Sequence, residues 1–140
     1  MDTKPYLRKA QYHETDQMGI IHHANYIRWF EEARVDFLDQ AGYSYEKSME
    51  SGIDFAVTGV AIEYKSMVRF PDTVSIALFI SELKSARMTI RYEVKNAATG
   101  TLCAVGSSSH CYFDSTKKRP VALPKVLPDL YALLEKYTEK

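Results

Sequence analysis

Asp16 is the side chain in this sequence that is best placed to take part in a chemical reaction. It lies in a polar loop, residues 14–19, which leads into a segment, residues 24–41, with the apolar spacing of a long helix. The first turn of a helix has unpaired N–H groups and a partial positive charge, which can polarise a carbonyl and hold the oxyanion formed when that carbonyl is attacked. A carboxylate nearby can act as a nucleophile or as a general base toward water. The alternative is that Asp16 only caps the turn, as aspartate often does.

Other reactive side chains are less well placed. The run 107–110 contains three serines and a histidine, but adjacent side chains in a strand point to opposite faces, which disfavours a catalytic triad. His22 and His23 are neighbours, yet zinc needs three or four ligands and no further ligand pair stands nearby. Cys103 and Cys111 lie in one expected strand, roughly 26 Å apart at about 3.3 Å per residue, too far for a disulfide. We therefore predict neither a metal site nor a disulfide.

The elements that must position Asp16 are a long helix and a sheet. In residues 24–41 the apolar side chains recur at helical intervals, and Gly42 follows as a helix stop. Residues 88–95 alternate strictly between apolar and polar, which is typical of a half-buried antiparallel strand. The order of elements predicts an α+β domain in which an antiparallel sheet curls over one helix. The expected strands are 4–12, 53–65, 72–83, 86–96 and 101–114, and the expected shorter helices are 44–51 and 126–137.

The composition is that of an ordinary globular domain. The 140 residues, divided by the roughly 150 of a typical domain, predict a single domain over residues 1–140. Eighteen basic residues offset eighteen acidic ones, so no overall field favours a nucleic acid or an anionic membrane as partner. No apolar run approaches the ~18 residues of a membrane span, and the start lacks a signal-peptide core. We therefore expect a cytoplasmic protein with neither nucleic acid nor membrane as a partner.

The segment from Tyr12 to Arg34, YHETDQMGIIHHANYIRWFEEAR, resembles the signature of 4-hydroxybenzoyl-CoA thioesterase-like proteins of the hot-dog fold. Its core is Thr-Asp-x-x-Gly-x-x-x-His-x-x-Tyr, and the later segment 119–124 resembles the one that closes the family's last strand. The resemblance covers residues 6–125, nearly the whole chain. It implies an acyl-CoA thioesterase, whose curled antiparallel sheet wraps around one long central helix.

The resemblance also implies roles for two residues. Asp16 matches the catalytic aspartate, and His23 occupies the position whose backbone N–H polarises the thioester carbonyl. Relatives with an aspartate nucleophile and with an aspartate base are both described, and the sequence does not choose between them. Coenzyme A is part of the substrate, so no metal or other cofactor is implied. The family pattern implies a homodimer with a continuous sheet and active sites at the interface, or a homotetramer of two dimers.

Seven further residues are candidates for substrate binding. Those in the strand 53–65 alternate on one face and could line an acyl pocket, core packing being the alternative. Glu31 matches the family's acidic helix position, but it lies one turn from Arg34 and could instead form a structural ion pair. The basic candidates could meet the coenzyme A phosphates or could be solvated surface. The seven are Tyr26, Glu31, Phe55, Val57, Gly59, Arg87 and Lys118.

Two other functions fit the same fold. A hydratase or dehydratase would need an acid/base pair acting at Cα and Cβ of the acyl chain, usually with a histidine side chain. Here Asp16 precedes His23 by seven residues, which resembles the thioesterase signature instead. A non-catalytic acyl-CoA-binding protein would bind coenzyme A esters without releasing a thiol.

Overall fold

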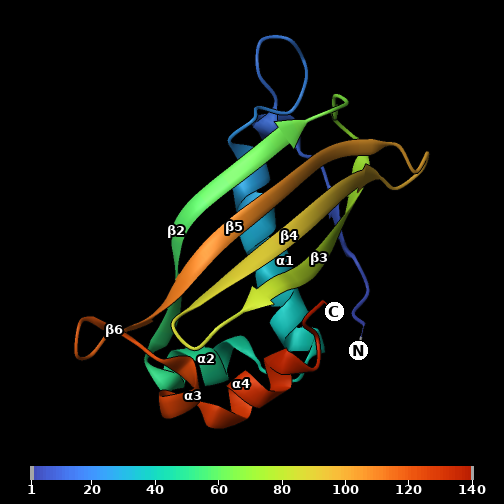
Figure 1. Ribbon diagram of the computed structural model, residues 1–140. Coiled ribbons are helices and arrows are strands. Elements are labelled where there is room, and N and C mark those ends of the chain that lie inside the picture. Colours follow the sequence, from blue (N-terminus) through green and yellow to red (C-terminus); the bar gives the residue numbers. More distant parts are fainter. Residues whose placement is uncertain (1, 140) are drawn as a thin grey trace.

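The computed structural model describes residues 2–139, and its main feature is one curved antiparallel sheet. The strands are β1 (Tyr6–Lys9), β2 (Ile53–Tyr64), β3 (Thr73–Leu83), β4 (Arg87–Asn96), β5 (Leu102–Asp114) and β6 (Arg119–Val121). They lie in the order β1-β3-β4-β5-β2, and β6 pairs with the end of β5. The sheet curves around the long helix α1 (Asn25–Gln40), as Figure 1 shows. This is the curled sheet over one helix that the sequence predicts.

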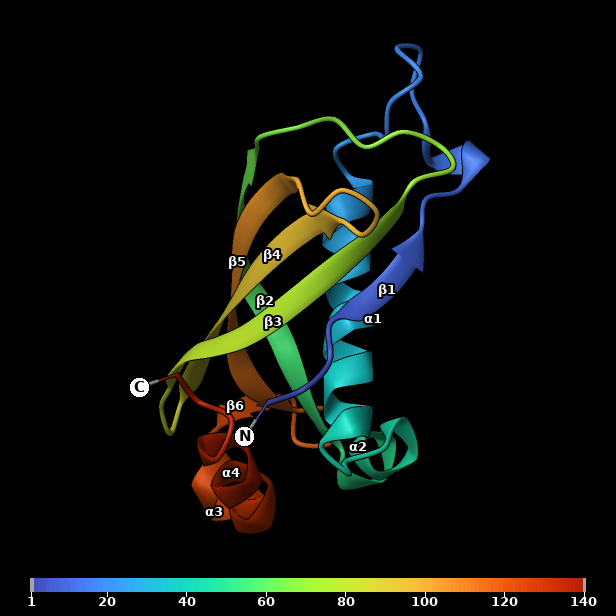
Figure 2. The same ribbon diagram turned by 90° about the vertical axis from the view of Figure 1, so that its right-hand side faces the viewer.

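Helix α1 packs along the concave face of the sheet (Figure 2). The ring of Phe30 stacks on that of Tyr92 in β4, with the ring centroids 4.0 Å apart. Gly106 of β5 lies so close to Phe30 that a Cβ at this position would come within 2.7 Å of the ring. The helix therefore approaches the sheet closely where β5 has no side chain. The buried face of the helix consists of Tyr26, Trp29, Phe30, Ala33 and Phe37, spaced three and four residues apart.

Strand β4 confirms the alternation predicted for residues 88–95. The residues Met88, Ile90, Tyr92 and Val94 are buried, and the residues between them are half-buried or exposed. Fully burying a side chain of this size contributes about 1.5–3 kcal/mol, so the apolar face of β4 fixes which side of the sheet meets the helix.

The two ends of the molecule differ in structure. The loop between β1 and α1 projects at one end, and three short helices gather at the other (Figures 1 and 2). Those helices are α2 (Tyr45–Ser51), α3 (Leu123–Val126) and α4 (Pro128–Glu135). Strand β2 begins beside them and ends near the loop, because the hydroxyl of its last residue, Tyr64, donates to the carbonyl of His23.

Three predicted boundaries are corrected. The expected helix 126–137 is α4, which covers only residues 128–135, and α3 before it was not predicted. Pro128 has no N–H to continue α3, and Leu127 between the two helices adopts φ −138° and ψ 69°. The first strand is shorter than 4–12, since Tyr12–Glu14 form a 3-10 turn. Strand β6 was not predicted as a strand, and its Pro120 is tolerated because β6 lies at a sheet edge.

The thiols of Cys103 and Cys111 are both free, as predicted. Within residues 2–139, no helix has the length and hydrophobicity that crossing a membrane requires.

Candidate active site

The loop that holds Asp16 is a tight antiparallel turn. Thr15 and Ile21 form an isolated bridge, and the Asp16 N–H donates to the Ile20 carbonyl at 2.8 Å. Gly19 closes the turn by donating its N–H to the Asp16 carbonyl at 3.0 Å, with a φ of +76° that glycine adopts without strain. The backbone of the loop is therefore fixed by its own hydrogen bonds.

The Asp16 carboxylate has one engaged oxygen and one without a protein partner. Its Oδ1 accepts the N–H of Met18 at 2.8 Å, which is the turn-capping bond proposed as the alternative role for this residue. Its Oδ2 accepts no hydrogen bond from the part of the chain described here. The cap therefore occupies one oxygen and leaves the other available for a reaction.

A cavity of about 340 Å³ brings Asp16, His23 and Tyr26 together. Its volume lies in the range of small-molecule sites, which begins at about 300 Å³. The wall beside the carboxylate is largely apolar, with contributions from the Asp16 loop, the start of α1 and the segment that follows β2. The lining residues are Asp16, Ile20, Ile21, His23, Tyr26, Tyr64, Lys65, Ser66, Met67 and Val68.

The peptide that joins His22 to His23 offers an unpaired donor. The His23 N–H donates to no protein acceptor within residues 2–139. The His22 carbonyl on the same peptide accepts the backbone N–H of Asn25 at 3.0 Å. Because His23 and Asp16 line the same cavity, this N–H is a candidate for the donor that an oxyanion needs.

Two tyrosines form the aromatic side of the cavity. The rings of Tyr26 and Tyr64 meet edge to face with centroids 5.0 Å apart. The Tyr64 hydroxyl donates to the His23 carbonyl at 3.0 Å, which ties the end of β2 to the start of α1. Burial is the main cause that raises the pKa of Tyr26 above its ordinary value, so its hydroxyl stays protonated at neutral pH.

The other sequence-predicted substrate residues lie outside this cavity. Phe55 and Val57 are in the first half of β2 and Gly59 is near its middle, and Val57 is seven residues before Tyr64, or about 23 Å away along the strand. Arg87, in β4, lies level with the start of β2. Cys111 in the intervening strand β5 pairs with Arg87 on one side and with Ala56 of β2 on the other. One chain therefore does not bring these residues to Asp16.

Lys118 and Glu31 also lie apart from the cavity. Lys118 is in the turn between β5 and β6, with a φ of +54°. Glu31 is on the exposed side of α1, and no ion pair joins it to Arg34 among residues 2–139. Arg34 instead donates to the Tyr92 hydroxyl at 3.1 Å. The structural ion pair considered for Glu31 is therefore absent from the described residues.

A serine and the histidine of the run 107–110 in β5 do lie in contact. The expectation from sequence applies only to adjacent residues, whose side chains point to opposite faces of a strand. Ser108 and His110 are two apart and share a face, and Ser108 Oγ lies 2.7 Å from His110 Nε2. Both are 1% exposed. Among residues 2–139, no carboxylate or other group hydrogen-bonds Nδ1, the second ring nitrogen of His110. Burial, followed by the charge of Arg34, lowers the pKa of His110 to about 4. This is a buried neutral pair in the core, not a nucleophile with its base.

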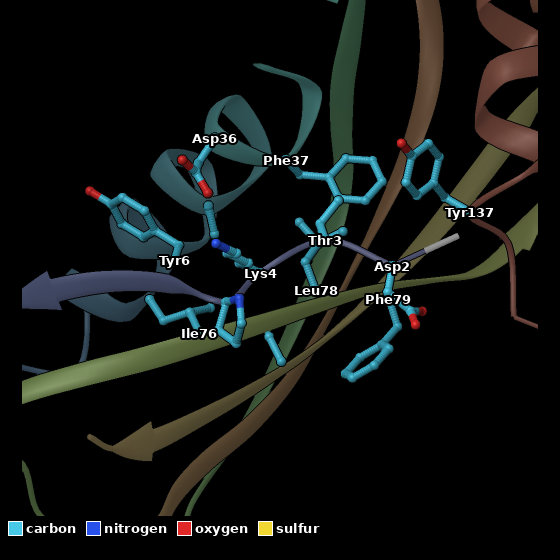
Figure 3. A pocket seen from close by; sticks show the side chains of 13 residues that line it. Asp2, Thr3, Lys4, Tyr6, Asp36, Phe37, Ile76, Leu78, Phe79 and Tyr137 are labelled. Carbon is cyan, nitrogen blue, oxygen red and sulfur yellow. The ribbon is translucent and has the colours of Figure 1, made fainter. Parts of the chain in front are cut away.

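A second cavity of about 230 Å³ lies between the N-terminal segment, α1 and β3 (Figure 3). Two of its polar side chains are already engaged, since the Tyr6 hydroxyl donates to Glu32 and the Asp36 carboxylate accepts from Gln40. It contains no sequence-predicted site residue. Among the described residues, no group of three His, Cys, Asp or Glu side chains could hold a metal ion.

Sequence reasoning missed the part of the cavity that comes from the end of β2 and the segment after it. Tyr64 lies at the end of a predicted strand, and its bond to His23 spans 41 residues of sequence. Nothing in the local pattern of residues 64–68 indicates that they meet Asp16. They are brought there by the pairing of β2 with β5 and by long-range bonds to the loop, such as the Ile21 N–H to the Val68 carbonyl at 2.8 Å.

Comparisons with known proteins show which family the chain resembles in sequence and in fold. Residues 10–132 match the thioesterase-like superfamily. YneP of Bacillus subtilis (strain 168), classed provisionally as an acyl-CoA thioesterase, is 30% identical over 91% of this chain and 92% of its own. The acyl-CoA thioester hydrolase YbgC of Escherichia coli O6:H1 is 27% identical over 84% of this chain and 87% of its own. The DHNA-CoA thioesterase structure from Staphylococcus aureus has a TM-score of 0.89 and 31% identity, covering 95% of this chain and 89% of that one.

Proposed function

Since the chain belongs to the thioesterase-like superfamily, with the hot-dog fold, we propose that it hydrolyses acyl-CoA thioesters to coenzyme A and carboxylic acids. The observation that carries this proposal is the cavity that Asp16 and His23 line together, because the His23 N–H has no protein acceptor among the described residues and Asp16 has a free carboxylate oxygen. The names of YbgC and of the Staphylococcus aureus enzyme support the substrate class. Coenzyme A belongs to the substrate, and the proposal involves no metal and no other cofactor.

The proposed chemistry begins with the thioester carbonyl in the cavity. Its oxygen would accept the His23 N–H, which becomes a stronger interaction as negative charge develops on that oxygen. In one route Asp16 removes a proton from water, the water oxygen bonds to the carbonyl carbon, and collapse of the oxyanion breaks the C–S bond. The thiolate of coenzyme A then takes up a proton. In the other route the Asp16 carboxylate attacks the carbonyl carbon, the C–S bond breaks and the coenzyme A thiolate leaves and takes up a proton. Water then hydrolyses the mixed anhydride, which releases the carboxylic acid and restores the Asp16 carboxylate.

The free oxygen of Asp16 supports either route. The Met18 N–H fixes Oδ1 and so sets the orientation of the carboxylate, while Oδ2 can accept a proton or form a bond. Removing one oxyanion donor typically lowers kcat by about 10²–10³-fold. The His23 N–H alone would therefore account for roughly 3–4 kcal/mol of the barrier reduction.

We propose further that two copies of the chain complete the site. Strand β2 has 12 residues at the edge of the sheet, and much of it is exposed, including Val57, Val60 and Tyr64. Such an edge offers unpaired backbone groups that soluble proteins tend to cover. Antiparallel pairing of two β2 strands would place the half of one strand that contains Phe55 beside the Tyr64 end of the other. The candidate residues that one chain keeps apart would then share one site.

This assembly is expected as a homodimer, or as a homotetramer of two such dimers. Light scattering at micromolar concentration should give a mass at least twice the 16.0 kDa of one chain. A fully active protein with the mass of one chain would contradict a shared site. We also propose a cytoplasmic location, which the two free thiols support because thiols stay reduced there.

The direct test of the reaction is thiol release from acetyl-, hexanoyl-, palmitoyl- and benzoyl-CoA, with hydrolysis in buffer alone as the control. We expect release above the buffer rate from at least one of these esters, unaffected by a metal chelator. Binding of the esters without release would favour the non-catalytic alternative. Hydration of an enoyl-CoA without release would favour the hydratase.

A further inference from the structure

Asn25 is the first residue of α1, and its side chain joins the two ends of the Asp16 loop. Its Nδ2 donates to the Glu14 carbonyl at 3.0 Å and to the His22 carbonyl at 3.3 Å. The two carbonyls lie on either side of the turn that contains Asp16. The His22 N–H adds a bond of 2.8 Å to the same Glu14 carbonyl. One side-chain amide therefore connects the 3-10 turn that leads to Asp16 with the peptide that joins His22 to His23.

The His22 carbonyl and the His23 N–H belong to one planar peptide. Because the peptide bond does not rotate, the direction of the carbonyl sets the direction of the N–H. Asn25 holds this carbonyl twice, through its backbone N–H at 3.0 Å and through its Nδ2 at 3.3 Å. Hydrogen bonds to the carbonyl of a peptide also polarise it and make its N–H a better donor. Asn25 therefore acts on both the direction and the strength of the His23 donor.

The Glu14 end of this link is anchored in the core. The Glu14 side chain is 3% exposed, and its carboxylate accepts Trp29 Nε1 at 3.0 Å. Arg8 donates to both of its oxygens, at 3.1 and 3.0 Å. Trp29 is fully buried in α1, so the same helix holds Glu14 through its indole and the His22–His23 peptide through Asn25.

We propose that Asn25 is a positioning residue for the oxyanion: its side-chain amide orients the His22–His23 peptide so that the His23 N–H meets the thioester oxygen in the transition state. This inference rests on the proposed hydrolysis of acyl-CoA and adds a residue that acts through its neighbours. Helix α1 has no side-chain cap on its first turn, so holding this peptide is not a by-product of capping the helix.

Two substitutions test the proposal. Asn25→Ala removes both Nδ2 bonds, and Asn25→Asp keeps the shape but turns the donor into an acceptor that faces two carbonyls. An aspartate in the first turn of a helix is favourable for the helix dipole, so Asn25→Asp keeps α1 stable. The matched control is Asn96→Ala, since Asn96 caps a hairpin turn outside the cavity by accepting the N–H groups of Ala98 and Thr99.

The measurement is kcat and KM for thiol release, on the most rapidly hydrolysed of the four esters, with thermal unfolding on the same preparations. We expect kcat to fall about 10- to 100-fold in both Asn25 variants, a part of the 10²–10³-fold that a lost oxyanion donor costs. The KM should change less than about threefold, because a transition-state interaction is lost rather than ground-state binding. The control should keep the wild-type kcat.

Several results would overturn the proposal. One is a folded Asn25 variant whose kcat stays within threefold of wild type, and another is a variant in which only KM rises. Loss of the fold in both Asn25 variants would also overturn it, since Asn25 would then be a purely structural residue. A wild-type protein that releases no thiol from any of the four esters would instead refute the proposed function, so the two failures are distinguishable.

Discussion

Replacing Glu14 by glutamine should destabilise the fold far more than the same change at Glu32. Both carboxylates bond Arg8, Glu14 through two nitrogens at 3.1 and 3.0 Å and Glu32 through Nε at 2.8 Å. Their surroundings differ, because the Glu14 side chain is 3% exposed and that of Glu32 is 35% exposed. Glu14 also accepts the Trp29 indole and the Gln11 N–H at 3.0 and 2.8 Å. Among the described residues, every hydrogen-bond partner of the Glu14 carboxylate is thus a donor.

The magnitude follows from these partners. An amide in place of the Glu14 carboxylate points an NH₂ group at donors and leaves Arg8 with a weaker partner. Breaking a buried pair in this way lowers the free energy of unfolding by about 3–5 kcal/mol. The pair with Glu32 is only partly buried, so it should contribute about 1 kcal/mol, near the upper end for pairs in contact with solvent. Urea unfolding of both variants at equal protein concentration would measure the difference, since association also shifts apparent stability. Equal destabilisation by the two substitutions would refute the assignment of Glu14 as the anchor of the loop.

Two further outcomes are expected. His23→Ala should keep kcat within about tenfold of wild type, because the backbone N–H remains. If the imidazole were instead the general base, the substitution would lower kcat by about 10²-fold or more and remove a limb of the pH–rate profile near pH 6–7. In the folded protein the pKa of His110 is lowered from 6.5 to about 4. Below pH 6.5 the unfolded chain therefore binds a proton at His110 more readily than the folded chain does. Through His110, the free energy of unfolding should therefore fall by about 3 kcal/mol as the pH falls from 7 to 4. In urea titrations across that range, His110→Gln should lack this loss. A variant with the pH dependence of the wild type would contradict the prediction.

The sequence predicts the fold well wherever its pattern is periodic. The spacing of Trp29, Phe30 and Phe37 determines which face of α1 is buried, and the alternation from Met88 to Val94 determines which face of β4 meets it. The patterns fail where a local exception decides the structure. Pro128 ends α3, which an amphipathic pattern over 126–137 does not show, and the three residues of β6 are too few for a periodic signal.

The candidate site is predictable in part, for a physical reason. Asp16, His23 and Tyr26 lie within one short stretch, so the loop and the first helical turn alone bring them into one cavity. Tyr64 reaches that cavity only through the register of β2 on β5, which a single sequence does not contain. The roles predicted for Phe55 and Arg87 remain predictions, since each lies at the far end of the sheet and would meet Asp16 only across two copies.

The measurement that tests the central claim most directly is the activity of Asp16→Asn, with wild-type protein prepared in parallel. Asparagine keeps the side-chain oxygen that accepts the Met18 N–H, so the turn and the melting temperature should be nearly unchanged. It removes the charge, and with it both the base and the nucleophile. We predict that kcat for thiol release falls by about 10³-fold or more, or roughly 4 kcal/mol of barrier, with KM little changed. A well-folded Asp16→Asn protein that keeps more than about a tenth of the wild-type kcat would contradict the account, because no barrier effect of that size fits such a rate.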